Sequence, residues 1–224
     1  MSTDSHGDPT RFCASVGVAH TTDGEAELAG RFHSITVVRH RPRTVGTWHV
    51  TTASRLTADC LAQLLGGQVH QDHANALAEI LTTTSIVDIL LADSDALHIG
   101  WQRIGHGICD GTTQDNGRPC ACPETIALRR AAAKQGYGCR PRAEVRFWLK
   151  GDPAMGVFDF AGEDWSFIEL VTAMRAALSI RAGNRPIRAR LGLRRSLHTL
   201  RSGRVLAYTR PVIEGLTVPT GAVD

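Results

Sequence analysis

The chain has 224 residues, of which 42% are hydrophobic and 21% are charged, and its net charge is +3 with histidine counted as neutral. This is the ordinary composition of a globular protein, so it excludes collagen, a coiled coil and wholesale disorder. No apolar run approaches the roughly 18 residues that a membrane-spanning helix needs, so we expect no membrane partner. The N-terminal residues also lack the pattern of a secretory signal, and the expected location is a reducing cytoplasm.

The first part of the chain combines strand patterns with one helix. Residues 1–29 are rich in Ser, Thr, Gly and Asp and are predicted to be a disordered lead-in. Strands are predicted over residues 32–38 and 45–50, with a break at Arg41-Pro42-Arg43 between them. A helix is predicted between the cap candidates in Thr51-Thr52-Ala53-Ser54 and the stop at Gly66-Gly67. Three further strands are predicted over residues 77–83, 86–91 and 96–104.

The remaining part begins with a loop and ends in a hairpin. Residues 105–123 are full of Gly, Asp, Asn and Pro, which is typical of a loop. Two helices are predicted, one over residues 124–135 and one from Asp164 or Ser166 to about Ser179. The predicted strands cover residues 144–149, 157–160, a stretch starting at 187, and 204–213, with a turn at Ser202-Gly203 between the last two.

These elements predict an α+β fold with a mostly antiparallel sheet or sheets, about three helices and a cysteine-rich loop that binds zinc. We expect four segments along the chain. They are the lead-in of residues 1–29, an N-terminal α+β part over 30–104, a cysteine-rich zinc-binding segment over 105–142, and a C-terminal α+β part with a basic hairpin over 143–218.

Four of the six cysteines fall within 31 residues: Cys109, Cys120, Cys122 and Cys139. In a cytoplasmic protein such a cluster indicates metal binding more often than disulfides. Zinc takes about four ligands in a tetrahedron, and thiolates are its usual structural donors. Four cysteine ligands fill that shell, so the expected zinc folds the loop and does no chemistry. Two alternatives stay open, namely unconnected thiols and reversible redox chemistry, and His106 is a possible substitute ligand.

The sequence predicts no catalytic site. His70 and His73 are spaced i, i+3 and lack the His-Glu-x-x-His pattern of zinc proteases, so we expect solvated loop residues. Asp93 and Asp95 are expected to form a polar turn. The glycine-rich nucleotide-binding motifs and Gly-x-Ser-x-Gly are absent from the sequence, so we expect a protein that is not an enzyme.

Arginine gathers near the C-terminus. Nine arginines and no acidic residue lie between Ser179 and Val212, which suggests an anionic partner. The strand that starts at residue 187 alternates apolar residues with basic ones, and the basic side chains are expected on its exposed face. The candidate partner-binding residues are Arg188, Arg190, Arg194 and Arg195.

Taken in order, several landmarks resemble one known family, the recombination directionality factors that accompany phage-type large serine integrases, in the group defined by an actinophage excision protein. The resemblance covers roughly residues 30–218. The matching segments are Gly30-Arg31-Phe32, Thr47 to Thr52, Leu64 to Val69, Glu79 to Thr82, Val87 to Leu91, Cys109-Asp110-Gly111, Cys120-Ala121-Cys122, Cys139 to Arg142, Gly156-Val157-Phe158, and Arg204 to Ile213.

The resemblance implies a non-enzymatic factor, encoded by a phage or mobile element and acting in a bacterial cell. Such a factor binds a large serine integrase on attachment-site DNA and switches it from integration to excision. The arginines would then meet an acidic integrase surface or nearby DNA phosphate. The alternative hypothesis is a zinc-stabilised nucleic-acid-binding regulatory protein, because the C-terminal part is basic. An enzyme of unknown type is the third class.

Overall fold

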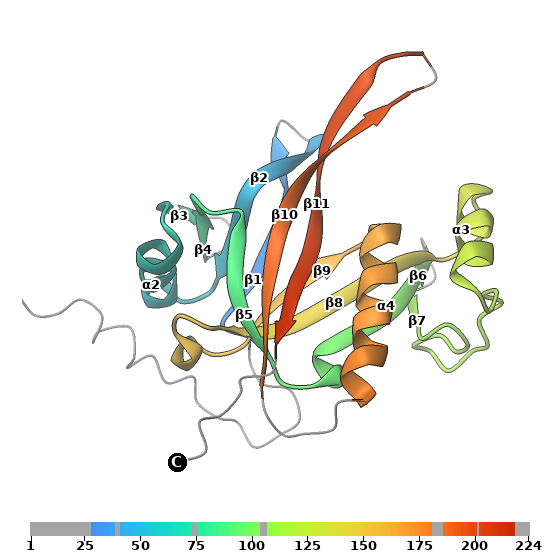
Figure 1. Cartoon of the computed structure of the whole chain (residues 1–224), viewed down its shortest axis with the longest axis horizontal. Helices are drawn as coiled ribbons and strands as arrows, with labels where there is room; N and C mark the ends of the chain where they lie inside the picture. The colour runs from blue at the N-terminus through green and yellow to red at the C-terminus, as the bar shows by residue number, and fades with distance from the viewer. Residues whose placement is uncertain are drawn as a thin grey trace, which may run out of the picture.

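The computed structural model describes residues 28–38, 41–72, 76–103, 107–180, 186–200 and 202–217. This part of the chain forms eleven β-strands and three α-helices, and nearly all strand pairs are antiparallel (Figure 1). The predicted α+β class is therefore confirmed. The predicted lead-in, His73 and His106 lie outside the described residues, apart from positions 28 and 29.

The elements follow one another in a mixed order. The first part holds β1 (Gly30–Val38), β2 (Arg41–Thr52), α2 (Arg55–Leu65), β3 (Gln68–Asp72), β4 (Leu77–Leu81), β5 (Ile86–Leu91), a 3₁₀ turn (Ser94–Ala96) and β6 (Leu97–Arg103). The second part holds β7 (Gly107–Cys109), α3 (Ile126–Lys134), β8 (Arg140–Leu149), a 3₁₀ turn (Pro153–Met155), β9 (Phe158–Gly162), α4 (Trp165–Ile180), β10 (Ile187–Thr199) and β11 (Val205–Thr217).

Strand β8 joins the parts of the sheet. The main order is β11-β10-β5-β8-β9-β1-β2-β4-β3, and β6 pairs with both β7 and β8. The sheet thus crosses the segment boundaries expected from the sequence, because β8 pairs with β5 and β6 from the first part of the chain. The parallel pair among the described strands is β1 with β9. Strands β10 and β11 also approach β2, so the sheet curls back toward itself.

Several local predictions differ from the structure. Strand β7 lies within the predicted loop of residues 105–123, and β8 begins at Arg140 rather than at residue 144. Strand β2 already begins at Arg41, where the sequence predicts a break, and Pro42 lies opposite Val37 in the hairpin. Proline is tolerated near the start of a strand, where its missing N–H costs fewer ladder hydrogen bonds than in the middle. Strand β3 was not expected, since its polar sequence carries no apolar alternation and it lies at the edge of the sheet. Helix α3 starts at Ile126 behind a cap at Thr125, two residues later than expected.

The core is built on a network of edge-to-face aromatic rings. Phe32 on β1 lies 5.7 Å from Trp48 on β2 and 5.3 Å from Phe147 on β8, measured between ring centroids. Phe160 on β9 lies 5.3 Å from Trp48 and continues the network to Phe167 on α4. All five side chains are essentially inaccessible to solvent. Buried aromatic pairs of this geometry add about 0.5–1.5 kcal/mol each beyond the area they bury, so this network fixes how β1, β2, β8, β9 and α4 pack.

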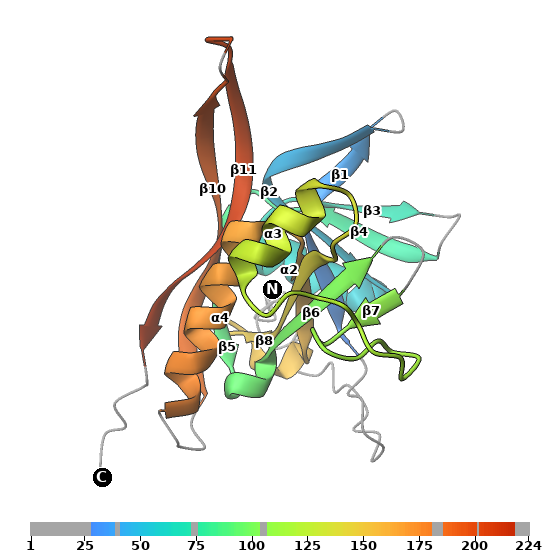
Figure 2. The ribbon, with the colours of Figure 1, turned by 90° about the vertical axis from the view of Figure 1, so that its right-hand side faces the viewer.

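Two helices close the core as the sequence predicts. Ser54 caps α2, because its hydroxyl accepts a hydrogen bond from the Thr57 amide, and Leu61 of that helix is fully buried. Asp164 caps α4 by accepting hydrogen bonds from the amides of Ser166 and Phe167. Helix α4 then packs against β6, β8 and β11, beside the cysteine-rich segment (Figures 1 and 2).

The opposite face of the sheet carries a row of polar residues. Arg31 on β1 lies in register with Asp159 on β9 and with Thr51 on β2. Its guanidinium donates to both Asp159 carboxylate oxygens, at 2.6–3.0 Å. His33 lies beside this pair, with its Nε2 3.0 Å from the Thr51 hydroxyl, and its ring faces that of His49 at 5.3 Å. Asp159 is completely buried, so Arg31 is its compensating charge.

His33 predicts a specific pH dependence of stability. Burial lowers the pKa of His33 from 6.5 to about 4, and His49 and Arg31 add to the shift against the weaker opposing influence of Asp159 and Glu79. Between these two pH values His33 is protonated in the unfolded chain and neutral in the folded protein. The free energy of unfolding should therefore fall as the pH drops from about 6.5 to about 4. In urea unfolding at pH 7 and pH 5, the His33→Gln variant should lose less stability than the wild type. Equal losses would contradict this account.

Candidate metal centre and basic hairpin

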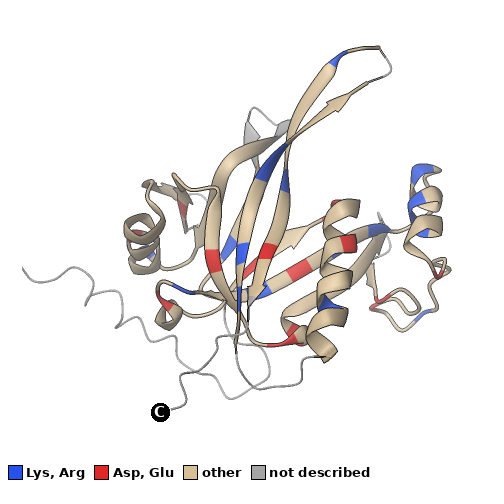
Figure 3. Cartoon of the chain, viewed as in Figure 1, with Lys and Arg blue, Asp and Glu red and all other residues tan. Residues whose placement is uncertain are grey.

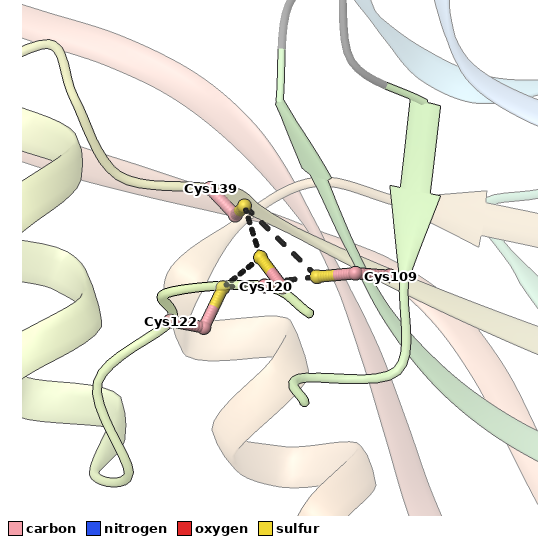
Figure 4. A group of neighbouring side chains, drawn as sticks. All are labelled: Cys109, Cys120, Cys122 and Cys139. Carbon is pink, nitrogen blue, oxygen red and sulfur yellow. Dashed lines mark hydrogen bonds between the residues drawn. The ribbon is translucent and has the colours of Figure 1, made fainter. Parts of the chain in front are cut away.

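The four clustered cysteines meet at one point in the structure. Cys109 ends β7, Cys120 and Cys122 come from the loop between β7 and α3, and Cys139 lies just before β8 (Figure 4). Their sulfur atoms all lie within 4.8 Å of one another, and Cys109 and Cys139 are buried. The structure therefore brings together the four ligands expected from the sequence, and they can hold a metal ion.

Three measured sulfur separations are close to those of a tetrahedral site. The distances are 3.7 Å between Cys109 and Cys122, 4.0 Å between Cys109 and Cys139, 3.7 Å between Cys120 and Cys139, and 3.2 Å between Cys120 and Cys122. Zinc–sulfur bonds of about 2.3 Å in a tetrahedron place sulfurs about 3.8 Å apart. A disulfide would require about 2.05 Å, so none of these four cysteines is bonded to another. Three of the four distances are close to the tetrahedral value, and the Cys-x-Cys pair is the tightest.

Burial changes the acidity of these thiols. It raises the pKa of Cys109 and of Cys122 to about 12, and that of Cys139 to about 11. For Cys120 burial acts in the same upward sense, but hydrogen bonds with Cys122, Cys109 and Cys139 outweigh it and lower the pKa. Because metals bind thiolates, a cation must displace the protons that the buried sulfurs otherwise hold.

Backbone hydrogen bonds shape the loop that carries Cys120 and Cys122. The Asp110 carboxylate accepts from the amides of Thr112 and Thr113, and these bonds lower the pKa of Asp110 to about 2. The Cys120 amide donates to the Thr112 carbonyl at 2.6 Å. Gly138 allows the chain to reach Cys139, because a Cβ there would lie 2.5 Å from the Ala133 backbone nitrogen. The turn residues around the cysteines therefore set the sulfur positions.

Arg129 ties the two ends of the loop together and was not identified from the sequence. Its Nη2 donates to the Gly111 carbonyl at 3.3 Å and its Nε donates to the Pro123 carbonyl, so it links the segments that follow Cys109 and Cys122. Its Cζ also lies 4.2 Å from the centroid of the Trp101 ring. In the sequence Arg129 belongs to an Ala- and Arg-rich helix and looks solvated. The residues near Arg129 in the sequence do not indicate this role, since Trp101 is distant along the chain.

The base of the C-terminal hairpin is less basic than the sequence suggests. Ile187, Ala189, Leu191 and Leu193 are buried, and Arg188, Arg190 and Arg194 are exposed, so the predicted alternation is confirmed. Strands β5 and β11 flank β10, however, and place Asp88 and Glu214 in register with Arg190. Arg190 thus has an acidic position on each neighbouring strand, and Figure 3 shows red segments on β5 and β11 beside the blue ones on β10.

Beyond this base, β10 and β11 continue as a two-stranded projection. Strand β5 pairs with β10 only as far as Gly192. We call residues 194–200 and 202–210 the arm; they extend past the rest of the sheet (Figures 1 and 2). Arg194 lies opposite Arg210 and forms an ion pair with Glu214 at the foot of the arm. Arg195 follows Arg194 directly in the strand, so it points to the other face. Of the four candidate arginines, Arg188 and Arg190 therefore lie in the base of the hairpin, and Arg194 and Arg195 lie on opposite faces of the arm.

His70, Asp93 and Asp95, which the sequence analysis also considered, lie in ordinary secondary structure. His70 lies in the exposed strand β3 rather than in a loop, opposite Glu79. Asp93 caps the 3₁₀ turn by accepting from the Asp95 amide at 2.7 Å, so these two residues form the expected polar turn.

A comparison with family models gives one match over most of the chain. The Gp3-like family, described as recombination directionality factor-like, matches residues 15–213. The chain belongs to this family. The match contains all four cysteines and the whole arm, and it extends into the predicted lead-in. No solved structure matches the chain.

Membership of the recombination directionality factor-like family supports a role in regulating recombination, and such proteins are in general regulatory rather than catalytic. It also implies a recombinase as partner in general terms. None of the helices in the described part of this family member is long and apolar enough to cross a membrane. The cysteine cluster and the hairpin thus belong to a member of the recombination directionality factor-like family.

Proposed function

We propose that the protein is a non-enzymatic recombination directionality factor that binds a large serine integrase on attachment-site DNA and switches it from integration to excision. The observation that carries this proposal is the family match over residues 15–213. Binding would act by stabilising one synaptic arrangement of the integrase more than another, because a ligand shifts an equilibrium only through its differential affinity for the two states.

The basic hairpin supports a role in partner binding. Arg188, Arg190, Arg194 and Arg195 are exposed on β10, and we propose that they contact the integrase, DNA phosphate beside it, or both. Exposed arginines are enriched among the residues that dominate protein interfaces, and they also bind phosphate well. The protein would act in the cytoplasm of a bacterial cell that carries the phage or mobile element.

We propose that the cysteine cluster holds a structural zinc ion. Four thiolates would fill the tetrahedral shell and leave no open position for substrate. Such an ion would hold β7, the following loop and the start of β8 together, while Arg129 links the two ends of the same loop through its hydrogen bonds to the Gly111 and Pro123 carbonyls.

The direct test is a recombination assay with purified components. The protein is added to a serine integrase encoded in the same genome, with plasmids that carry either the original attachment sites or the hybrid sites. We expect it to promote recombination between hybrid sites and to suppress recombination between the original sites. A serine integrase from an unrelated element is the control and should not respond. Unchanged product ratios with the same-genome integrase would refute the proposal.

A second candidate function is nucleic-acid-binding regulation, which is favoured by the exposed arginines of the arm. It predicts binding to DNA without any integrase, with an affinity that falls steeply as salt rises. A mobility-shift titration at two salt concentrations separates the candidates. If no shift occurs at low salt, the DNA-binding candidate is excluded.

A further inference from the structure

The arm exposes four large apolar side chains to solvent. Leu197 is 67% exposed, Val205 55%, Tyr208 41% and Leu206 38%. These four account for nearly a third of the thirteen exposed large hydrophobic residues in the described part of the chain. Clustered exposure of this kind marks interaction sites, whereas scattered single residues need no explanation.

Both faces of the arm carry such residues. Leu197 lies opposite Ala207, and Thr199 lies opposite Val205, on the continuation of the core-facing side of β10. On the other side Tyr208 lies opposite Ser196, and Leu206 lies opposite His198. A two-stranded ribbon of this kind is only marginally stable in water by itself, so a partner that covers it would stabilise it.

The charge of the arm indicates the chemistry of that partner. Arg195 and Arg204 are exposed, and Arg194 and Arg210 lie opposite each other in register. The sequence between Arg194 and Glu214 contains no Asp or Glu. Arginines that project on both faces, with apolar side chains between them, fit a surface that is acidic and partly apolar.

We propose that the arm is the surface through which the protein docks on its recombinase, against an acidic and partly apolar face of that protein. This inference rests on the proposed function. A protein partner fits better than DNA, because phosphate contacts use the arginines and leave four large apolar side chains unexplained. A second copy of the chain fits less well, because two arms would bring like charges together.

The test changes apolar and basic residues of the arm separately. Leu197→Thr with Tyr208→Thr removes two apolar contacts and keeps residues that favour strands. Arg195→Gln with Arg204→Gln removes two charges. The matched controls are Leu81→Thr, at a half-exposed position on β4, and Arg140→Gln, at an exposed position on β8. The affinity of each variant for the purified same-genome serine integrase is measured with and without attachment-site DNA.

We expect each arm pair to weaken integrase binding at least tenfold and the controls to change it less than twofold. Thermal melting should be unaltered in the arm variants, because the arm lies outside the core, and in the two controls, because both positions are exposed. Binding by both arm pairs equal to that of the wild type would overturn the inference and leave the proposed function intact. Failure of the wild-type protein itself to bind would overturn both. If the variants instead lose binding to DNA alone, or lose self-association, the occupant is DNA or a second copy and the inference is wrong.

Discussion

Replacing Cys139 by serine is expected to abolish metal binding and to destabilise the segment between β7 and β8. Cys139 is buried, with its sulfur 3.7 Å from that of Cys120 and 4.0 Å from that of Cys109. A serine hydroxyl stays protonated at neutral pH and is a weak zinc ligand, so three thiols would remain for a four-coordinate ion. The metal content should fall from about one ion per chain to almost none.

The loss of stability should follow from linkage. An ion present at about a thousand times its dissociation constant stabilises the folded state by about 4 kcal/mol. Zinc should therefore raise the unfolding free energy of the wild type in urea titrations, and a chelator should lower it, while the Cys139→Ser variant should respond to neither. Ala121→Ser places the same hydroxyl in the same loop at an exposed position and should keep the metal. Undiminished metal content in Cys139→Ser would show that the cluster is not the ligand set.

Replacing Arg31 by methionine is expected to destabilise the protein strongly, although Arg31 belongs neither to the cysteine cluster nor to the arm. Asp159 is completely buried, and the Arg31 guanidinium holds both of its carboxylate oxygens. Removing one partner of a buried pair leaves an uncompensated charge and costs about 3–5 kcal/mol. Because the Arg31 side chain is itself 47% exposed, we expect a value near the lower end, about 3 kcal/mol.

The chain offers a matched control for this effect. Arg55 pairs with Asp59 on the surface of α2 at 3.1 Å, and both side chains are about half exposed. Such an exposed i, i+4 pair contributes about 0.3–0.5 kcal/mol, so Arg55→Met should change the unfolding free energy little. Adding Asp159→Asn to Arg31→Met should recover part of the loss, since the buried carboxylate is gone. If Arg31→Met and Arg55→Met lowered the unfolding free energy equally, the burial of Asp159 would not contribute to the cost of losing its partner.

Much of the fold could be predicted because local patterns determine it. The alternation from Ile187 onward predicted β10 and the side of it that is buried. Cap candidates within residues 51–54, and at Asp164 or Ser166, predicted the starts of α2 and α4, and the structure uses Ser54 and Asp164. Strand β3 was missed, because an edge strand with polar side chains carries no periodic signal and forms only when β4 lies beside it.

The sequence predicted the candidate metal ligands of the site, but it did not predict Arg129, which holds the loop that carries them. Cysteine spacing and surrounding turn residues were enough to propose Cys109, Cys120, Cys122 and Cys139 as one cluster, and their sulfurs do meet. Arg129 could not be predicted, because its partners are the Trp101 ring on β6 and the carbonyls of Gly111 and Pro123 in the loop. Every residue has a backbone carbonyl, so the residue type does not reveal which carbonyl accepts a hydrogen bond from an arginine.

The sequence by itself determined the class of the fold, the four cysteines of the cluster and the concentration of arginine near the C-terminus, because composition, periodicity and spacing are properties of neighbouring residues. The tertiary structure alone decided that Arg31 would meet Asp159 across 128 positions, and that Asp88 and Glu214 would flank Arg190. It also decided that the arm would extend beyond β5 with its apolar side chains uncovered. Strand pairing depends on how the whole core packs, so these contacts between distant residues follow from the folded sheet and not from any local pattern.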